Sequence, residues 1–585
     1  MSENPSAGPC CGTARAAAAA DACCDPAAKS EAVASGAGCC GPASAPAAEA
    51  PAAEAPAAEA PVSSGDCCAT TVTSLATDVN VRAAPLDDGE SALPVVVIGA
   101  GPVGLAAAAH LHERGLPFLV LEAGDEVAAS VRQWGHVGIF SPWRYDIDAA
   151  ARRLLDAAGW AAPADDALPT GAQLVEEYLQ PLAKLPAIAA HLRLGARVVA
   201  MSRVGVDRVR TAGRTDLPFV VRLADGTDIT AGAVIDASGT WRTPNPLGVN
   251  GLLAHGEDQA ADLIDHALPD MLGADRDPHA GRHTIVVGAG HSAANTLLDL
   301  ARLARTAPGT RITWAVRGGS AQRAFGGEDA DQLPARGALG SGLRTLVDTG
   351  AVTLVQGFGV HTVRRTAGGI TLVAADGRIL TGDRVVSATG FRPDHSIAGE
   401  LRLDLDPILG CTRTLADLID PNEHSCGTVR PHGHKELAHP EANYYAVGMK
   451  SYGRAPTFLM ATGYEQVRSI AAALAGDVAA ADDVRLDLPE TGVCSSSLVA
   501  DNAAREIAAR FGLAQDVPRK LAAATMALLP TAASTGDAVR AAAQQMGLDS
   551  EIALQIAALT DQPGAPASVA GLISLTPATG GSCRA

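Results

Sequence analysis

A strand, a glycine-rich turn and a helix follow one another twice in this chain, and this repeated unit constrains the fold more than any other feature. In the first copy an apolar run at residues 93–98 enters the turn Gly99-Ala100-Gly101-Pro102-Val103-Gly104, and a helix to about residue 115 and a strand at 117–121 follow. Gly99 permits the tight turn, Gly101 lets the backbone approach a pyrophosphate, and Gly104 lets the helix pack on its strand. Glu122, 23 residues after Gly99, is placed to accept hydrogen bonds from a ribose.

The second copy has the same order. Residues 284–287 form the strand, Gly288-Ala289-Gly290-His291-Ser292-Ala293 form the turn, and a helix to about residue 304 precedes a strand at 311–316. Gly288, Gly290, Ser292 and Ala293 are expected to hold a second dinucleotide, with alanine in place of the third glycine. The residue after the second strand is Arg317 instead of an acid. Because an arginine can pair with a 2′-phosphate, the second domain is expected to prefer NADPH over NADH.

Two similar strand-to-glycine segments follow the two units. Residues 233–236 lead into Ala237-Ser238-Gly239, and residues 384–387 lead into Ala388-Thr389-Gly390. These segments are expected to carry the chain between nested domains, and Asp225-Gly226 is expected to close a hairpin ahead of the first one. The predicted fold class is therefore α/β, with two nested Rossmann-type dinucleotide-binding domains.

The predicted domain boundaries follow from these units and from composition. They are a tail at 1–92, a first domain at 93–245, an inserted domain at 246–385, the rest of the first domain with a substrate region at 386–480, and a helical region at 481–585 with helices at 504–511, 519–529 and 535–548.

The first 92 residues are mostly Ala, Pro, Gly, Ser and Glu. Such a segment offers too little apolar surface to offset the entropy of ordering, so we expect a disordered tail. Eight of the 12 cysteines form adjacent pairs here: Cys10 and Cys11, Cys23 and Cys24, Cys39 and Cys40, Cys67 and Cys68. In a reducing compartment these thiols are candidates to capture a thiophilic metal or metalloid, because soft thiolates prefer soft centres. The alternative is a low-complexity tail whose cysteines bind nothing specific.

The charge excludes some partners. Lys and Arg number 45 against 64 Asp and Glu, which gives a formal net charge of −19. This charge disfavours nucleic acid and anionic membranes as partners. Neither a secretory signal nor an apolar run of membrane-spanning length is present, so the sequence predicts a cytoplasmic location. The oligomeric form stays open, with a homodimer among the alternatives.

Several motifs together resemble the flavin-containing monooxygenases of the two-dinucleotide-binding flavoprotein group. They are residues 99–104, Glu122, Ala237-Ser238-Gly239-Thr240-Trp241, residues 288–293 and Ala388-Thr389-Gly390-Phe391-Arg392-Pro393, and the resemblance covers residues 93–475.

The resemblance implies FAD in the first domain and NADPH in the second. It implies cofactor-binding roles for Gly239, Thr389 and Gly390 where the domains join, and places Gly448 near the flavin phosphates. It also implies that NADPH reduces FAD and that the reduced flavin uses O2 to oxygenate a small-molecule substrate. The family's linking motif is incomplete, because Asn250 and Gln259 stand where aromatic residues are expected.

The nearest alternative class, the pyridine-nucleotide disulfide reductases, needs a redox-active cysteine pair beside the flavin. No cysteine occurs between Val95 and Leu409. The sequence therefore favours oxygen chemistry over dithiol chemistry.

Two later segments, 420–432 and 448–457, resemble the flavin monooxygenases associated with arsenic resistance. The resemblance implies oxidation of a trivalent arsenical, arsenite or methylarsenite, to the pentavalent form. Cys426, Cys494 and Cys411 are the candidate substrate ligands, since thiolates bind such a centre. The alternatives are a monooxygenase of an amine, a sulfide or a ketone, and a thiol-based metalloid carrier.

Two further groups have no settled role in the sequence. His424, Cys426, His432 and His434 have spacings that a transition metal could exploit, although a loop broken by Gly and Pro is also consistent with ordinary surface. Trp143-Arg144-Tyr145 is expected on a loop over the flavin or the nicotinamide cofactor.

Overall fold

The computed structural model describes residues 92–326, 331, 333–421, 429–455, 459–486, 510–513, 517–528 and 534–560. The paired cysteines of the predicted tail lie outside these residues, as do Cys426 and Cys494. Within the described part of the chain, every helix is too short or too polar to span a bilayer.

The first domain is built on a five-stranded parallel sheet in the order β16-β7-β1-β2-β3. Its strands are β1 (Val95–Ile98), β2 (Phe118–Leu121), β3 (Leu192–Arg193), β7 (Ala233–Asp236) and β16 (Tyr444–Ala446). Side chains alternate across β1: Val95 and Val97 pack in one apolar core, and Val96 and Ile98 pack in another. A strand buried on both faces needs a continuous apolar run, which the sequence has here.

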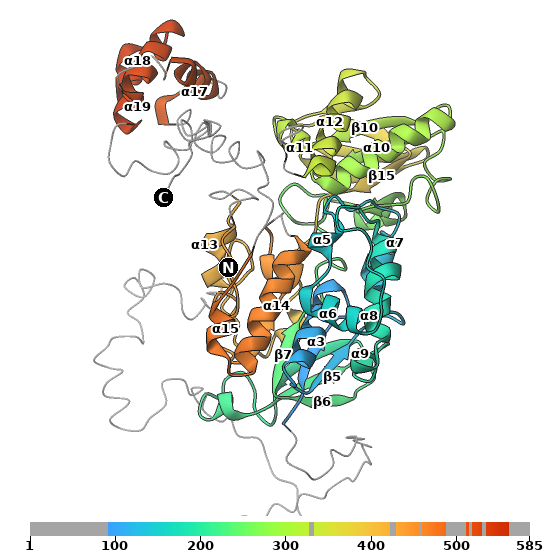
Figure 1. The fold of residues 1–585 in the computed structure, drawn as a ribbon. Helices are drawn as coiled ribbons and strands as arrows, with labels where there is room; N and C mark the ends of the chain where they lie inside the picture. Colours follow the sequence, from blue (N-terminus) through green and yellow to red (C-terminus); the bar gives the residue numbers. More distant parts are fainter. Residues whose placement is uncertain are drawn as a thin grey trace, which may run out of the picture. The chain divides into compact units, whose positions relative to one another are not determined.

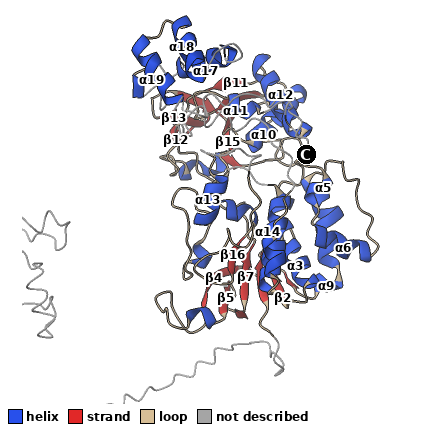
Figure 2. Cartoon of the chain, turned by 60° about the vertical axis from the view of Figure 1, so that its left-hand side comes forward, coloured by secondary structure: helices blue, strands red, loops and turns tan. Residues whose placement is uncertain are grey.

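Different layers cover the two faces of this sheet. Helices α3 (Pro102–Glu113) and α14 (Met460–Leu474) lie side by side on one face (Figures 1 and 2). A three-stranded antiparallel sheet of β4 (Val198–Arg203), β5 (Phe219–Leu223) and β6 (Asp228–Ala231) packs against the other face. The β5–β6 hairpin confirms the turn predicted at Asp225-Gly226.

The second domain repeats this design. Its parallel sheet has the order β11-β10-β9-β15-β8, with β8 (Ile264–His266), β9 (His283–Val287), β10 (Arg311–Ala315), β11 (Thr353–Val355) and β15 (Arg384–Ser387). Helices α10 (His291–Thr306) and α12 (Pro334–Asp348) pack on one face. The antiparallel strands β12 (Val360–Thr366), β13 (Gly369–Ala374) and β14 (Ile379–Gly382) pack on the other.

The second domain is inserted into the first. The chain passes from β7 into the second sheet and returns after β15 to add β16 beside β7. Both predicted βαβ units are confirmed, because β1 pairs with β2 and β9 pairs with β10 in parallel. One boundary differs: β15 pairs with β9 through Ser387, so the second sheet extends past residue 385.

Short helices occupy the connections within these domains. They are α4 (Ala129–Arg132), α5 (Trp143–Asp146), α6 (Ala149–Ala157), α7 (Gly171–Gln173), η1 (Leu174–Leu179), α8 (Gln180–Lys184), α9 (Pro186–Ala189), η2 (Arg214–Asp216), η3 (Asp258–Leu263), α11 (Gln322–Phe325), η5 (Ser396–Ala398), α13 (Arg413–Ile419), η6 (Gly448–Tyr452) and α15 (Val478–Asp482).

The C-terminal region contains α17 (Val517–Leu528), α18 (Thr535–Gln545) and α19 (Ser550–Thr560), which bury a small apolar core of their own. The helices predicted at 519–529 and 535–548 are confirmed, and most of the one predicted at 504–511 lies outside the described residues. Helix α19 is missing from the sequence prediction. Asp549 marks its start, because Oδ1 of this residue accepts hydrogen bonds from the N–H groups of Glu551 and Ile552.

Candidate functional site

The first glycine turn has the geometry that a pyrophosphate cradle requires. Gly99 has a φ of +100°, and a Cβ there would lie 2.8 Å from the carbonyl oxygen of Ala237. A Cβ on Gly104 would lie 1.9 Å from the carbonyl oxygen of Gly99, so α3 can approach the turn only at a glycine. Gly101 differs, because, its chain neighbours aside, no atom of the described residues lies within 4 Å of its Cβ position. This side of the turn is open to a ligand.

The N-terminus of α3 leaves its N–H groups available. Gly101 is the N-cap residue, Pro102 follows it, and no side chain caps the helix. The first N–H groups of a helix have no partner within the helix, and the helix dipole adds positive charge there. The turn and the helix end together fit a phosphate group.

Glu122 stands at the carboxyl end of β2 and is only 8% exposed. Its Oε2 accepts a hydrogen bond of 2.7 Å from the N–H of Ala100, and its Oε1 accepts one of 2.8 Å from the N–H of Gly124. These bonds fix the turn, a role that the sequence did not indicate. A carboxylate has about four acceptor positions, so about two remain for ribose hydroxyls.

An arginine that sequence reasoning missed lies in the loop after β2. Arg132 on α4 donates from Nε to the carbonyl oxygen of Val127 at 3.3 Å and pairs with Glu126 at 2.9 Å. Its Nη2 is buried and has no hydrogen-bond partner among the described residues. An anionic ligand such as a phosphate would satisfy this nitrogen, whose burial alone is unfavourable. Only the burial singles out this arginine, so the sequence holds no signal for it.

The carboxyl ends of β7 and β16 meet in a buried ion pair. Lys450 Nζ lies 2.7 Å from Asp236 Oδ2 and 3.0 Å from Ser238 Oγ, and Tyr444 OH donates to the same carboxylate at 3.1 Å. Burial by itself raises the pKa of Asp236, but the Lys450 ammonium and the bonds from Ser238 hold it below its ordinary value. The pair fixes η6 against the loop after β7, where Gly239 has a φ of +69° and an open Cβ position.

Gly448 begins η6 directly after β16. Its φ is +66°, and a Cβ there would lie 3.2 Å from the side chain of Val103 on α3. Its N–H donates to Oε1 of the buried Gln466 at 2.8 Å. Gly448 therefore borders the helix of the first cradle, and its own N–H is used within the protein.

The second turn repeats the geometry of the first. Gly288 has a φ of +138°, and a Cβ there would lie 2.1 Å from the carbonyl oxygen of Ala388. Gly290 is the N-cap of α10, and no side chain caps this helix. Within the described part of the chain, no atom beyond its two neighbours lies within 4 Å of its Cβ position. Ser292 is half-buried at the second position of the helix. Ala293 is fully buried in the core beneath α10, so a methyl group is accommodated where the first turn needs a glycine.

Arg317 follows β10 at the carboxyl edge of the second sheet. Its side chain is exposed and forms no hydrogen bond or ion pair with another described residue. The buried Trp314, three residues earlier, donates from Nε1 to the carbonyl oxygen of Gly288 at 2.7 Å and so ties β10 to the glycine turn. A cation held at this edge of the sheet fits a 2′-phosphate.

Two connecting segments join the domains and pair with each other. The N–H of Asn245 donates to the carbonyl oxygen of Gly390 at 2.9 Å, and Thr389 Oγ1 donates to the carbonyl oxygen of Asn245 at 2.7 Å. The rings of Trp241 and Phe391 lie with their centroids 4.9 Å apart. Thr389 and Gly390 thus hold the two connecting segments together, and their predicted part in cofactor binding stays a prediction.

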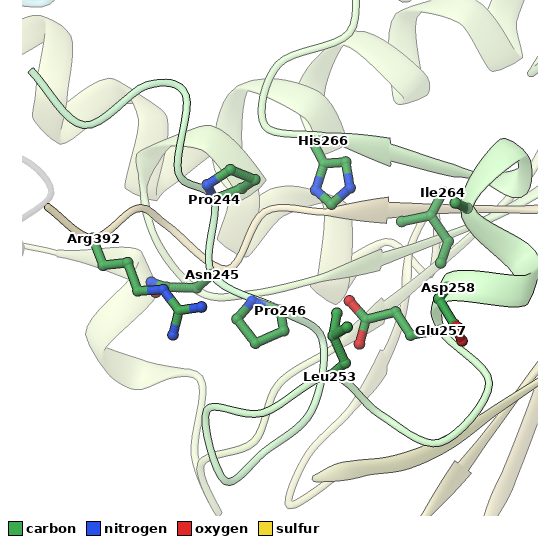
Figure 3. A pocket seen from close by; sticks show the side chains of 10 residues that line it. Pro244, Asn245, Pro246, Leu253, Glu257, Asp258, Ile264, His266 and Arg392 are labelled. Carbon is green, nitrogen blue, oxygen red and sulfur yellow. The ribbon is translucent and has the colours of Figure 1, made fainter. Parts of the chain in front are cut away.

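A cavity of about 240 Å³ opens beside these segments, at the carboxyl end of β8 (Figure 3). Arg392, His266 and Glu257 are among the residues that line it. The Glu257 carboxylate accepts hydrogen bonds from the N–H groups of Leu247 and Ala254, at 2.9 and 2.7 Å. Ligand pockets usually measure about 300–1,000 Å³, so this cavity is too small for a dinucleotide. The cavity lies in the segment that contains Asn250 and Gln259, where the linking motif of the flavin-containing monooxygenases is incomplete.

Cys411 is the cysteine that the described residues include, and it is 1% exposed in the core of the first domain. Burial, reinforced by Asp406, raises the pKa of its thiol to about 12. The thiol therefore stays protonated at neutral pH and closed to solvent, which disfavours it as a substrate ligand. The other two candidates, Cys426 and Cys494, lie outside the described residues.

Two histidines of the predicted metal cluster have protein partners. Nδ1 of His432 lies 2.9 Å from the carbonyl oxygen of Arg430, and Nε2 of His434 pairs with Asp482 at 2.9 Å. Among the described residues, no three His, Cys, Asp or Glu side chains are arranged to hold a metal ion. His424 and Cys426 lie outside the described residues.

Two open glycine cradles, each at the carboxyl edge of a parallel sheet, define an oxidoreductase of the two-dinucleotide-binding class. Residues 96–406 match the family model of the pyridine nucleotide-disulphide oxidoreductases, and the chain belongs to this family. The match confirms the predicted α/β fold and a flavin-dependent oxidoreductase, although the family is named for the disulfide reductases that the placement of the cysteines disfavours. No curated protein matches the sequence.

Several solved structures are similar to this chain at low identity. The bacillithiol disulfide reductase of Bacillus cereus is 19% identical, with a TM-score of 0.48 over 66% of this chain and 99% of that one. A flavin-containing monooxygenase of Stenotrophomonas maltophilia is 21% identical, with a TM-score of 0.42 over the same shares of 66% and 99%. The FAD-bound cadaverine monooxygenase of Erwinia amylovora is 14% identical, with a TM-score of 0.47 over 68% and 96%. These likenesses include reductases and monooxygenases, and they do not decide between the two.

Proposed function

We propose that the protein is an FAD- and NADPH-dependent monooxygenase. The observation that carries the proposal is the pair of glycine turns with an open side at Gly101 and Gly290, each at the positive end of a helix. The acid Glu122 follows the first unit and the cation Arg317 follows the second. An acid suits the hydroxyls of a ribose and an arginine suits a 2′-phosphate, so FAD is assigned to the first cradle and NADPH to the second.

Several residues around the first cradle fit this assignment. The start of α3 would hold the pyrophosphate of FAD and Glu122 its ribose, and the buried Nη2 of Arg132 suits the phosphate charge. The Asp236–Lys450 pair keeps the surrounding loops in place. In the second cradle, the start of α10 and Arg317 would hold the matching parts of NADPH.

FAD, when bound, would supply a hydride acceptor for NADPH and the dioxygen chemistry that oxygenates the substrate. For arsenite the overall balance is arsenite, dioxygen, NADPH and a proton giving arsenate, NADP⁺ and water. Arsenic and NADPH each lose two electrons, and dioxygen gains four. The chain itself would bind and orient both nucleotides.

Cysteine placement supports dioxygen over a disulfide as the electron acceptor. Dithiol chemistry requires two thiols beside the flavin, but no cysteine occurs between Val95 and Leu409. Cys411, which follows this span, is buried and its thiol pKa is raised to about 12. Residues 95–411 therefore supply no pair of thiols, which favours dioxygen as the electron acceptor.

We further propose a trivalent arsenical, arsenite or methylarsenite, as the substrate. The support is the resemblance of segments 420–432 and 448–457 to arsenic-associated monooxygenases, together with the thiols of Cys426, Cys494 and the tail. Trivalent arsenic combines a lone pair that can accept oxygen with an affinity for thiolates.

The test is to measure NADPH and dioxygen consumption by the FAD-loaded protein with and without arsenite or methylarsenite, and to identify the product by chromatography. We expect both rates to rise together and the pentavalent arsenical to form. Equal rates with and without the arsenical would show that the substrate assignment is wrong, and an amine, sulfide and ketone panel in the same assay tests the alternative substrates. A protein that purifies colourless and takes up no added FAD would contradict the monooxygenase itself.

A further inference from the structure

An aromatic ring from the first domain lies against the second cradle. Phe140 belongs to the loop between α4 and α5, and His291 is the first residue of α10. Their ring centroids are 5.0 Å apart, with the ring planes tilted by 46°. The two domains are therefore in contact at the N-terminus of α10, which is the proposed binding site of the pyrophosphate. Aromatic pairs at this separation attract each other.

A buried ion pair of the second domain lies on another side of the ring. The guanidinium of Arg336, on α12, is 5.9 Å from the centroid of Phe140. Arg336 and Asp331 form two hydrogen bonds with each other, and they are 8% and 7% exposed. This pair limits the positions that the ring can take.

The loop that carries Phe140 is held from behind by buried polar bonds. The N–H of Ile139 donates to the carbonyl oxygen of Pro169 at 2.8 Å, and Ser141 Oγ donates to Asp146 Oδ1 at 2.7 Å. Ser141 and Asp146 are 4% and 0% exposed. The backbone that carries Phe140 is thus held by its own domain.

The direction of the bound dinucleotide determines which half meets this ring. Arg317, at the end of β10, marks the adenosine end, and the start of α10 marks the pyrophosphate. The nicotinamide end must reach the flavin, and the flavin belongs to the first domain. A ring supplied by the first domain at the start of α10 therefore stands on the nicotinamide side.

We propose that Phe140 is a positioning residue for the nicotinamide half of NADPH, supplied to the second cradle by the first domain. This inference rests on the proposed function. Burial of the imidazole and the nearby Arg336 guanidinium lower the pKa of His291 to about 4, although the residue keeps an exposed surface. A neutral imidazole carries no charge to pair with a phosphate, so the N–H groups at the start of α10 would bind the pyrophosphate.

The test compares the binding of NADP⁺ with that of 2′,5′-ADP, which lacks the nicotinamide half, by titration calorimetry on the FAD-loaded protein. Phe140→Leu should weaken NADP⁺ binding about 3- to 10-fold, the value of an aromatic contact, and leave 2′,5′-ADP within about twofold of wild type. Phe140→Tyr should restore NADP⁺ binding. Arg317→Ala should weaken both ligands, because both carry the 2′-phosphate.

Phe118→Leu is the matched control. Phe118 also packs on a histidine, with 4.7 Å between its ring centroid and that of His191, but it lies at the start of β2, away from both glycine turns. Unchanged NADP⁺ binding in Phe140→Leu, or an equal loss for both ligands, would overturn the inference. A wild-type protein that binds neither ligand would instead refute the proposed function.

Discussion

At the scale of single residues, the glycines of the first turn serve two separable purposes. Gly104 packs against the Gly99 carbonyl, whereas Gly101 faces open space and has a φ of −81°, which alanine can adopt. Gly101→Ala should therefore fold with an unchanged midpoint of thermal unfolding as the apoprotein but retain about tenfold less FAD, because its methyl group would occupy the place of the pyrophosphate. Gly104→Ala should lower the unfolding midpoint. Flavin absorbance relative to protein absorbance measures the first effect, and full flavin content in Gly101→Ala would refute the cradle.

Asp146 should make stability depend on pH. Its side chain is 0% exposed, and burial raises its pKa from 3.8 to about 7 against the opposing hydrogen bond from Ser141. The native state then holds a proton that the unfolded state has released, so this contribution is complete below about pH 4 and is lost as the pH rises to about 7. Asp146→Asn cannot ionise.

Between pH 5 and pH 8 the wild type should thus lose on the order of 2 kcal/mol of unfolding free energy relative to Asp146→Asn. Urea unfolding followed by tryptophan fluorescence at the two pH values measures the difference. A difference that stays constant between them would show that Asp146 is already ionised in the native protein.

The roles of individual residues were predictable where a motif sets them. The spacing of Gly99, Gly101 and Gly104 sufficed to locate the first turn, and the end of the second strand sufficed to locate Glu122, but not its bonds to Ala100 and Gly124. The unpartnered nitrogen of Arg132 and the Asp236–Lys450 pair were not predictable, because each depends on burial or on a partner distant in sequence. Cys411 was predicted as a substrate ligand only because it is a cysteine. The apolar core around it keeps the thiol protonated and therefore unreactive.

At the scale of elements, the paired connecting segments should couple the two domains. Thr389→Val keeps the shape of the side chain but removes the hydroxyl that donates to the Asn245 carbonyl at 2.7 Å. Losing one such bond costs about 1 kcal/mol, so the orientation of the domains becomes less defined. We expect stopped-flow measurements to show several-fold slower flavin reduction by NADPH, with unchanged FAD content and NADP⁺ affinity. Unchanged reduction kinetics would mean that the segments join the domains without orienting them.

Elements with strong local patterns were the predictable ones. The apolar run of β1 and the alanine-rich helix α3 are set by residues next to each other in sequence. The strands β12–β14 and helix α19 were missed. The three strands have one exposed face, which dilutes their apolar pattern, and α19 follows Gly547 so closely that the sequence reads as the end of α18.

At the scale of the whole molecule, the placement of β16 shows what a single sequence leaves open. Tyr444–Ala446 reads as a strand, but three apolar residues fit the edge of either sheet. In the structure these residues pair with β7, and the hydroxyl of Tyr444 donates a hydrogen bond to Asp236 of that strand. The second half of the first domain is therefore fixed by a contact between distant segments and by no local signal.

The tail allows a test that separates catalysis from capture. All eight paired cysteines precede residue 92, and β1 begins at Val95, so deleting residues 1–92 leaves the first sheet intact. If the thiols deliver arsenite to the site, the deletion should raise the KM for arsenite several-fold, because the tethered thiols no longer raise its local concentration, and kcat should stay within about twofold. Full-length protein with the eight cysteines changed to serine should behave like the deletion. An unchanged KM would show that the cysteine pairs take no part in delivering arsenite. Loss of kcat at saturating arsenite would instead favour the thiol-based carrier. An enzyme whose cofactors and reacting groups lie in the folded domains does not need the tail once its site is saturated.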